Sequence, residues 1–140
     1  FGKLWKTYMS SNGDQVVDRH LFVNGKTNSK ITAHNLIFTE GPELTISGGA
    51  ITVTHSFHKV DTESDASSDN LDQINGGVSG QILILKPVND SRTVVIRSDE
   101  RNITTSGDTA FSMDDINDTA VLFNDAGEWY QIVNVSLGAS

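Results

Sequence analysis

Short stretches with the period of a β-strand dominate the hydrophobic pattern of this chain. In residues 50–54, isoleucine and valine alternate with threonine, which is the pattern of a strand that buries one face. Residues 81–85 form a continuous apolar run that ends at Lys86-Pro87 and is too short for a typical helix. We therefore expect one half-buried strand and one central strand that is buried on both faces.

Turn signals separate these and other strand-length segments. Gly48-Gly49 predicts a tight hairpin, because glycine adopts the positive φ angles that such turns need. Residues 119–124 and 128–135 flank the turn at Asp125-Ala126-Gly127 and predict a closing hairpin. The pairs Asn12-Gly13 and Asn24-Gly25 predict hairpins near the start of the chain.

These segments together predict an all-β fold. No stretch sustains a helical apolar period, and the turn signals favour mainly antiparallel pairing. We expect an antiparallel β-sandwich or a barrel-like, jelly-roll-like domain over residues 44–140. Residues 1–43 are expected to form an extended N-terminal arm with hairpins, used for attachment or oligomerisation. No internal repeat of solenoid type is evident.

An acidic segment, residues 61–72, interrupts the strand pattern. It holds five carboxylates and no basic residue: Asp61, Glu63, Asp65, Asp69 and Asp72. We expect it to face water or a cation, and residues 69–74 favour one helical turn. Its spacing imitates an EF-hand loop, but Ala66 stands where that loop needs glycine. A solvated acidic loop is therefore expected in preference to a calcium site.

Charge is distributed unevenly along the 140 residues. The net charge of −8 argues against nucleic acid as a partner, because binding a polyanion needs clustered Lys and Arg. Residues 1–30 hold five basic and two acidic residues, a balance of +3 that leaves −11 for the remainder. The arm is expected to attach to an acidic or apolar surface, or else to pack on its own domain. The candidate attachment residues are Lys3, Trp5, Lys6, Tyr8 and Phe22.

Residues with catalytic or metal-binding potential show no arrangement typical of a site. His55 and His58 fall on opposite faces of a strand, and the adjacent pair Asp114-Asp115 lacks the separation across a cleft that paired catalytic acids need. The chain contains no cysteine, no P-loop and no nucleophile elbow. We expect no catalytic residue, no metal site and no cofactor. No apolar run is long enough to span a bilayer, so membrane insertion is not expected.

Two adjacent aromatic residues stand out in the closing hairpin. Flat aromatic faces pack on the apolar faces of sugars, so Trp129 and Tyr130 are candidates for binding a glycan. The alternative is that one of them is buried in the core or in an interface between copies of the chain.

Several of these pieces resemble a small β-domain of tailed-bacteriophage virion proteins, in capsid decoration proteins and in tail fibre or tail spike modules. The resemblance covers about residues 44–135. The matching pieces are residues 46–53, 58–63, 71–77, Gly80 with the apolar run after it, 101–103, 118–123 and 127–130.

The resemblance implies a non-enzymatic structural protein on the virion surface, on capsid or tail, whose relatives are usually trimeric. We expect a homotrimer that contacts other virion proteins and supports particle assembly or stability. Exposed strand edges, which a symmetric oligomer covers, are a physical reason for such assembly. The alternative function is recognition of a host-surface glycan by a tail fibre or spike.

Overall fold

The computed structural model describes residues 34–137 of the chain. The chain divides into two units between Leu36 and Ile37, and the architecture below is that of the unit that begins at Ile37. The hairpins predicted at Asn12-Gly13 and Asn24-Gly25 lie outside the described residues.

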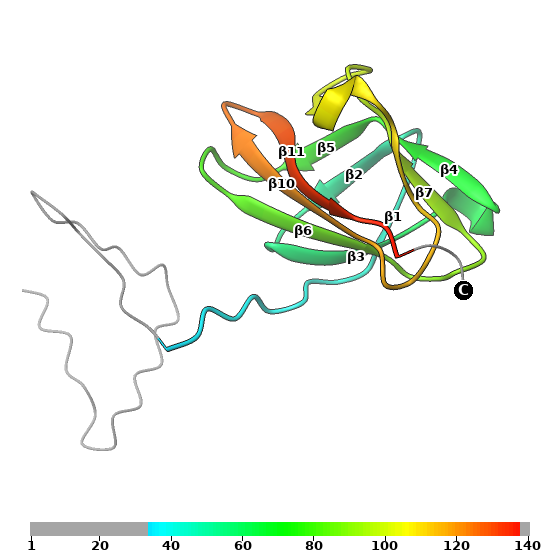
Figure 1. The fold of residues 1–140 in the computed structure, drawn as a ribbon, viewed down its shortest axis with the longest axis horizontal. Coiled ribbons are helices and arrows are strands. Elements are labelled where there is room, and N and C mark those ends of the chain that lie inside the picture. Colours follow the sequence, from blue (N-terminus) through cyan, green and yellow to red (C-terminus); the bar gives the residue numbers. More distant parts are fainter. Residues whose placement is uncertain (1–33, 138–140) are drawn as a thin grey trace, which may run out of the picture. The chain divides into compact units, whose positions relative to one another are not determined.

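Eleven strands and two short 3-10 helices make up this unit as far as it is described (Figure 1). The elements in chain order are β1 (Leu44–Thr45), β2 (Ala50–Val53), β3 (Phe57–Asp61), η1 (Glu63–Asp65), β4 (Ser68–Leu71), β5 (Gln73–Gly76), β6 (Ile82–Pro87), β7 (Thr93–Ile96), β8 (Ile103–Thr104), η2 (Ser106–Asp108), β9 (Phe111–Met113), β10 (Thr119–Asp125) and β11 (Glu128–Val135). Neither 3-10 helix has the length or apolar character to cross a membrane. The expected all-β class is confirmed.

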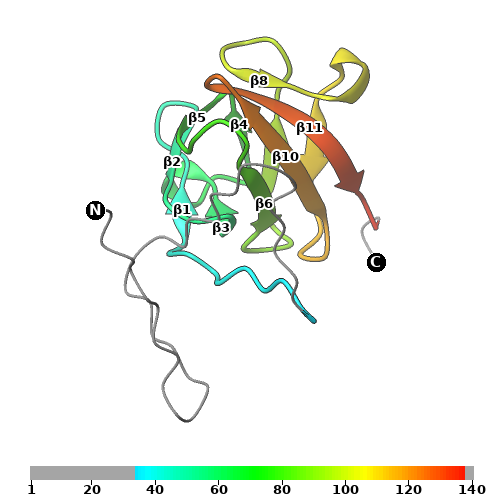
Figure 2. The same ribbon diagram turned by 90° about the vertical axis from the view of Figure 1, so that its left-hand side faces the viewer.

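The strands form three sheets. The largest has the order β1-β3-β6-β10-β11-β8, and Figures 1 and 2 show β3, β6, β10 and β11 side by side in it. A second sheet pairs β2 with β5, and a third has the order β4-β7-β9. Except for β10 and β11, strands that are consecutive in the chain therefore lie in different sheets.

Parallel pairing of strands within each sheet gives this unit its architecture. The parallel pairs β2–β5, β4–β7 and β3–β6 place Ala50 opposite Gln73, Ser68 opposite Thr93 and Phe57 opposite Ile84. Paired residues of these strands are thus 23, 25 and 27 positions apart in the sequence, respectively. The chain winds in solenoid-like coils, and β9, β10 and β11 add antiparallel strands to their end.

The expected mainly antiparallel sandwich is not what the described residues form, because parallel strand pairs outnumber antiparallel ones. The segment between β3 and β6 carries β4 and β5, and a connection of this length lets the chain return in the same direction. Since the offset between coils varies, the sequence shows no constant repeat.

The glycine turn forms as predicted, but the hairpin does not continue from it. Ser47 and Ala50 exchange two backbone hydrogen bonds around Gly48 and Gly49, whose φ angles are +56° and +78°. Beyond the turn, β1 pairs with β3 and β2 pairs with β5. The closing hairpin of β10 and β11 is confirmed, with a bulge opposite Val121 and Leu122.

The helical turn expected at residues 69–74 is wrong, because this segment supplies parts of β4 and β5. Leu71 and Ile74 both reach the core, as a helical turn would require. They do so across a bend at Asp72, whose N–H donates to the carbonyl of Gly49 at 2.8 Å.

The core lies between the three sheets. Its members are Ile46, Ile51, Val53, Val60, Leu71, Ile74, Leu83, Leu85, Val94, Ile96, Ile103, Phe111, Met113, Ala120, Leu122 and Trp129. Each sheet contributes alternate residues of its strands to this cluster, as the pleat of a β-strand requires.

In the second sheet, the position beside β5 is occupied by the side chain of Asn102 and not by a third strand. The Asn102 amide donates to the carbonyl of Ile74 at 2.8 Å, and its Oδ1 accepts the N–H of Ile74 at 2.9 Å. Asn102 thereby makes both hydrogen bonds that a further strand would offer at this residue.

The central strand β6 buries only one face in the described structure, contrary to the expected burial on both faces. Leu83 and Leu85 lie in the core, whereas Ile82 and Ile84 are half-buried on the opposite face of the sheet. The three-sheet arrangement covers the inner face alone, and this leaves an apolar outer face.

Candidate functional site

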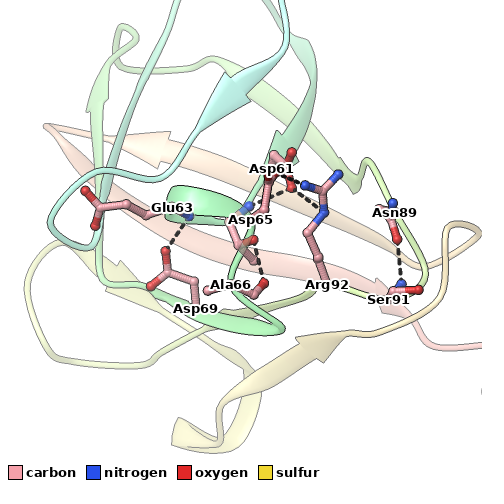
Figure 3. Close-up of polar contacts among 9 residues, drawn as sticks. Asp61, Glu63, Asp65, Ala66, Asp69, Asn89, Ser91 and Arg92 are labelled. Atoms are coloured by element: carbon pink, nitrogen blue, oxygen red, sulfur yellow. Dashed lines mark hydrogen bonds and ion pairs between the residues drawn. The ribbon is translucent and has the colours of Figure 1, made fainter.

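The acidic segment is held by groups that are distant in sequence. Arg92, which precedes β7, lies between Asp61 and Asp65 and forms ion pairs with both (Figure 3). Its Nε is 3.2 Å from Asp61 Oδ1, outside good hydrogen-bond geometry. Asp69 accepts the N–H groups of Glu63 and Asn70 at 2.9 and 2.8 Å. The expectation that this segment faces water or a cation is therefore wrong for Asp61, which is buried against Arg92, whereas Glu63 and Asp65 are exposed to water as expected.

The strongest of these contacts joins Asp72 to Arg97. Arg97 Nε and Nη2 donate to the two carboxylate oxygens at 2.5 and 2.6 Å, the bidentate geometry in which guanidinium and carboxylate match best. The side-chain hydrogen bonds from Arg97 hold the pKa of Asp72 below its usual value, although burial opposes this shift. The pair clamps the bend between β4 and β5 to the end of β7.

Arg92 and Arg97 were missed by reasoning from the sequence alone. The signal that would have found Arg97 is its offset of 25 residues from Asp72, equal to the offset between paired residues of β4 and β7. That offset becomes visible only once parallel pairing of these strands is assumed.

Asp72→Asn is expected to make stability less dependent on pH in the acidic range. Because the pKa of Asp72 is lowered in the folded state, its pair stabilises the protein above the unfolded pKa of about 3.9 and is lost as pH falls through the folded pKa. Urea unfolding at pH 7 and at pH 3 should show a large difference between wild type and variant at pH 7 and a smaller one at pH 3. The exposed Asp114→Asn serves as the control, and a difference that stays constant with pH would contradict the role of the pair.

The EF-hand-like positions do not converge on one point. Asp61 and Asp65 face Arg92, Glu63 accepts the N–H of Gly48 at 3.3 Å, and Asp72 faces Arg97. Within residues 34–137 there is no group of three or more His, Asp or Glu side chains arranged to hold a metal ion. These carboxylates therefore fix loops and neighbouring coils.

The two histidines of the H-x-x-H motif have structural contacts. His58 is fully buried, and its Nε2 accepts the N–H groups of Thr54 and His55 at 3.1 and 2.9 Å. Its Nδ1 lies 2.8 Å from the carbonyl of Pro42 and donates to it, since Nε2 is the acceptor. With both ring nitrogens occupied, His58 has no lone pair to share with a metal that His55 also binds.

The Asp114-Asp115 pair belongs to a closed loop. The N–H groups of both residues donate to Oδ2 of the buried Asp118, at 2.9 and 3.1 Å. Asp115 is itself buried, and its Oδ1 accepts the N–H of Asn117 at 2.8 Å. This geometry stabilises the turn before β10.

Trp129 lies in the core and not on a sugar-binding surface. Its ring is fully buried, and its Nε1 donates to the carbonyl of Ile74 at 3.2 Å. A Cβ at Gly77 would lie 2.6 Å from the ring, so the indole packs directly on that glycine. The glycan-stacking role considered for Trp129 conflicts with this placement, because strand alternation turns Trp129 inward and Tyr130 outward.

Tyr130 belongs to an apolar outer face of the six-stranded sheet. This outer face consists of Phe57, Ile82, Ile84, Val121, Phe123, Tyr130 and Val133. One row runs across four strands, because Phe57 pairs with Ile84, Ile84 with Val121 and Val121 with Val133. Ile82, Phe123 and Tyr130 form the neighbouring row.

The outer face is the strongest candidate for a functional surface in the described residues. Tyr130 is 43% exposed and Val133 49%, while the other members are half-buried. A contiguous apolar surface of this kind marks a place where proteins associate. The candidate attachment residues Lys3, Trp5, Lys6, Tyr8 and Phe22 lie outside the described residues.

The arrangement thus provides a surface for association, built on a fold whose acidic and histidine side chains are used for internal contacts. Comparisons of the chain with family models, with curated proteins and with solved structures find no match.

Proposed function

We propose that this protein is a structural component of a tailed-bacteriophage virion, located on the surface of the capsid or tail. It assembles as a homotrimer and contacts other virion proteins without catalysing a reaction. The resemblance of residues 44–135 to virion β-domains supports the class of protein. The outer face is the observation that carries the proposed mode of action, which is assembly through an apolar sheet.

The hydrophobic effect favours covering the outer face. Fully burying one Val, Ile or Phe side chain contributes about 1.5–3 kcal/mol, and a large part of that gain is already realised for the half-buried members. Seven apolar or aromatic side chains contribute together, however, and their rows lie in register on four adjacent strands. Packing of the three copies against one another on this face would bury them together.

The charges around the outer face allow another copy of the chain as the partner. The chain carries a net charge of −8, so two copies repel each other over most approaches. The two rows of the outer face contain no charged side chain. The row on one side of them holds Lys59 opposite Lys86, and the row on the other side holds Asp125 opposite Glu128. The apolar rows themselves therefore bring no carboxylates together.

Val121→Lys is expected to convert the trimer into a folded monomer. Val121 lies at the centre of the long row, between Ile84 and Val133, so a lysine there would have to be buried without a partner in the assembled form. Native mass spectrometry or light scattering should give the mass of three chains for wild type and of one chain for the variant. Circular dichroism checks that the monomer remains folded.

Ser112→Lys is the matched control for this experiment, because Ser112 is exposed on β9 in a different sheet. It should leave the mass of the assembly unchanged. A wild-type protein that is monomeric at all concentrations, or a Val121→Lys protein that remains trimeric, would contradict assembly through the outer face.

The place of the protein on a particle has its own test. Antibodies raised against residues 44–137 should label intact virions at discrete positions in electron microscopy. Removal of residues 1–30 should leave a folded body that no longer joins particles, since attachment is assigned to the arm. Particles that carry no label, or an arm-less protein that still incorporates, would refute these assignments separately.

Recognition of a host glycan is the competing function, and Tyr130 is the aromatic residue that is exposed for it. A glycan array on which wild type binds a sugar and Tyr130→Ala does not would favour this function. Val121→Lys distinguishes the two hypotheses, because it should disrupt assembly without removing the Tyr130 ring.

A further inference from the structure

The outer edge of β11 has no described strand partner over most of its length. β8 pairs with β11 only at Trp129 and Tyr130. The helix η2 follows β8, and its Ser106 donates its N–H to the Gln131 side chain at 3.3 Å, so no described strand lies beside residues 131–135 (Figure 2). Ile132 is 55% exposed and Val133 49% exposed. An exposed apolar edge is a template on which another extended segment adds by backbone hydrogen bonds.

The same unit contains a segment that pairs with no described strand. Residues 37–39 belong to no described strand, and Ile37 is 82% exposed. Immediately after them the chain is anchored, because Gly41 donates its N–H to the carbonyl of Phe57 at 2.8 Å and Glu40 bridges to Phe57. Exposure of a large aliphatic side chain in an extended segment is costly unless a partner covers it.

Residues 37–39 cannot reach the free edge of their own β11. Glu40 occupies the position of β1 beside β3, and β11 lies four strands further along the sheet. Four strand spacings amount to about 19 Å, whereas three extended residues span about 10 Å. Only the β11 edge of another copy is within reach of these residues.

We propose that residues 37–39 of one copy add as a strand to the free edge of β11, residues 131–135, in a neighbouring copy. The inference rests on the proposed self-association and names the contact that links the copies. Each copy then contributes residues 37–39 to one neighbour and its β11 edge to the other neighbour. Such a head-to-tail interface closes into a ring when the rotation per copy allows it.

The two segments match in chemistry. Ile37, Phe38 and Thr39 carry no charge, and neither do residues 131–135 (Gln-Ile-Val-Asn-Val). In a chain with a net charge of −8, this pairing avoids contact between carboxylates. Backbone hydrogen bonds provide affinity, and Ile37 would be covered by the apolar side chains of the edge.

Cysteine cross-linking tests the contact directly, because the chain contains no cysteine. Full-length Ile37→Cys and Val133→Cys chains, distinguished by a tag, are mixed and treated with a short bismaleimide. We expect a mixed cross-linked dimer in high yield. The control is Ile37→Cys mixed with Ser112→Cys, which should give at least tenfold less product.

The outcomes separate this inference from the proposed function. A trimer by native mass spectrometry without the 37–133 cross-link overturns the arm exchange and leaves the trimer intact. A monomer overturns both. Equal cross-linking to the Ser112→Cys control also overturns it. So does a dominant product joining two Val133→Cys chains, because it indicates that two β11 strands meet, through their edges or across the outer face.

Discussion

Trp129→Ala is expected to lower the free energy of unfolding by about 3–5 kcal/mol, the usual cost of removing a large aromatic side chain from a core. The indole is fully buried, packs on Gly77 and donates to the carbonyl of Ile74, so its loss leaves both a cavity and an unpaired carbonyl lone pair. Urea unfolding followed by circular dichroism measures the effect.

Tyr130→Ala provides the neighbouring control in the same strand. Tyr130 is 43% exposed, so its removal should cost the isolated chain about 1 kcal/mol or less. Equal destabilisation by the two substitutions would contradict the inward orientation of Trp129. The difference also matters for functional tests, since a loss of binding in the Trp129→Ala protein would report unfolding and not a lost contact.

Gly76→Ala is expected to have the second large effect. Gly76 has φ +78°, and a Cβ there would lie 2.5 Å from the backbone carbonyl oxygen of Val53 on the paired strand β2. The left-handed conformation costs an L-residue about 1–2 kcal/mol. The clash adds about 1–3 kcal/mol, because a backbone atom cannot move aside as a flexible side chain can.

Gly80→Ala separates these two contributions. Gly80 has φ +92° but open space around its Cα, so alanine there meets only the conformational penalty. Thermal or urea unfolding should place Gly76→Ala below Gly80→Ala in stability by about 1–3 kcal/mol. If the two variants are equally stable, β2 and β5 are not packed as closely as the structure indicates.

Local signals in the sequence predicted the features that depend on neighbouring residues. The glycine pair at 48–49 specifies its turn, and the turn at 125–127 specifies the closing hairpin between two apolar strands. The place of Trp129 and Tyr130 in the closing hairpin also led to the alternative that one of them is buried, and Trp129 is the buried one. Each of these depends on backbone geometry within a few residues.

Features that depend on distant residues were not predicted. Strand-length apolar segments pair in either direction, so alternation alone did not distinguish parallel coils from an antiparallel sandwich. The arginine partners of the acidic segment became visible only in the folded chain, because Arg97 lies 25 residues after Asp72. The apolar run of β6 predicted burial on both faces, which is wrong, because the described residues bury only the face of Leu83 and Leu85.

The Asn102 side chain limits where a further strand can add to the sheets. By satisfying the N–H and carbonyl of Ile74, it leaves no free pair at that residue on which an incoming chain could nucleate. A further strand therefore cannot hydrogen-bond to β5 at Ile74 unless the Asn102 side chain moves away. Asn102 thus protects this sheet edge from strand addition at that residue.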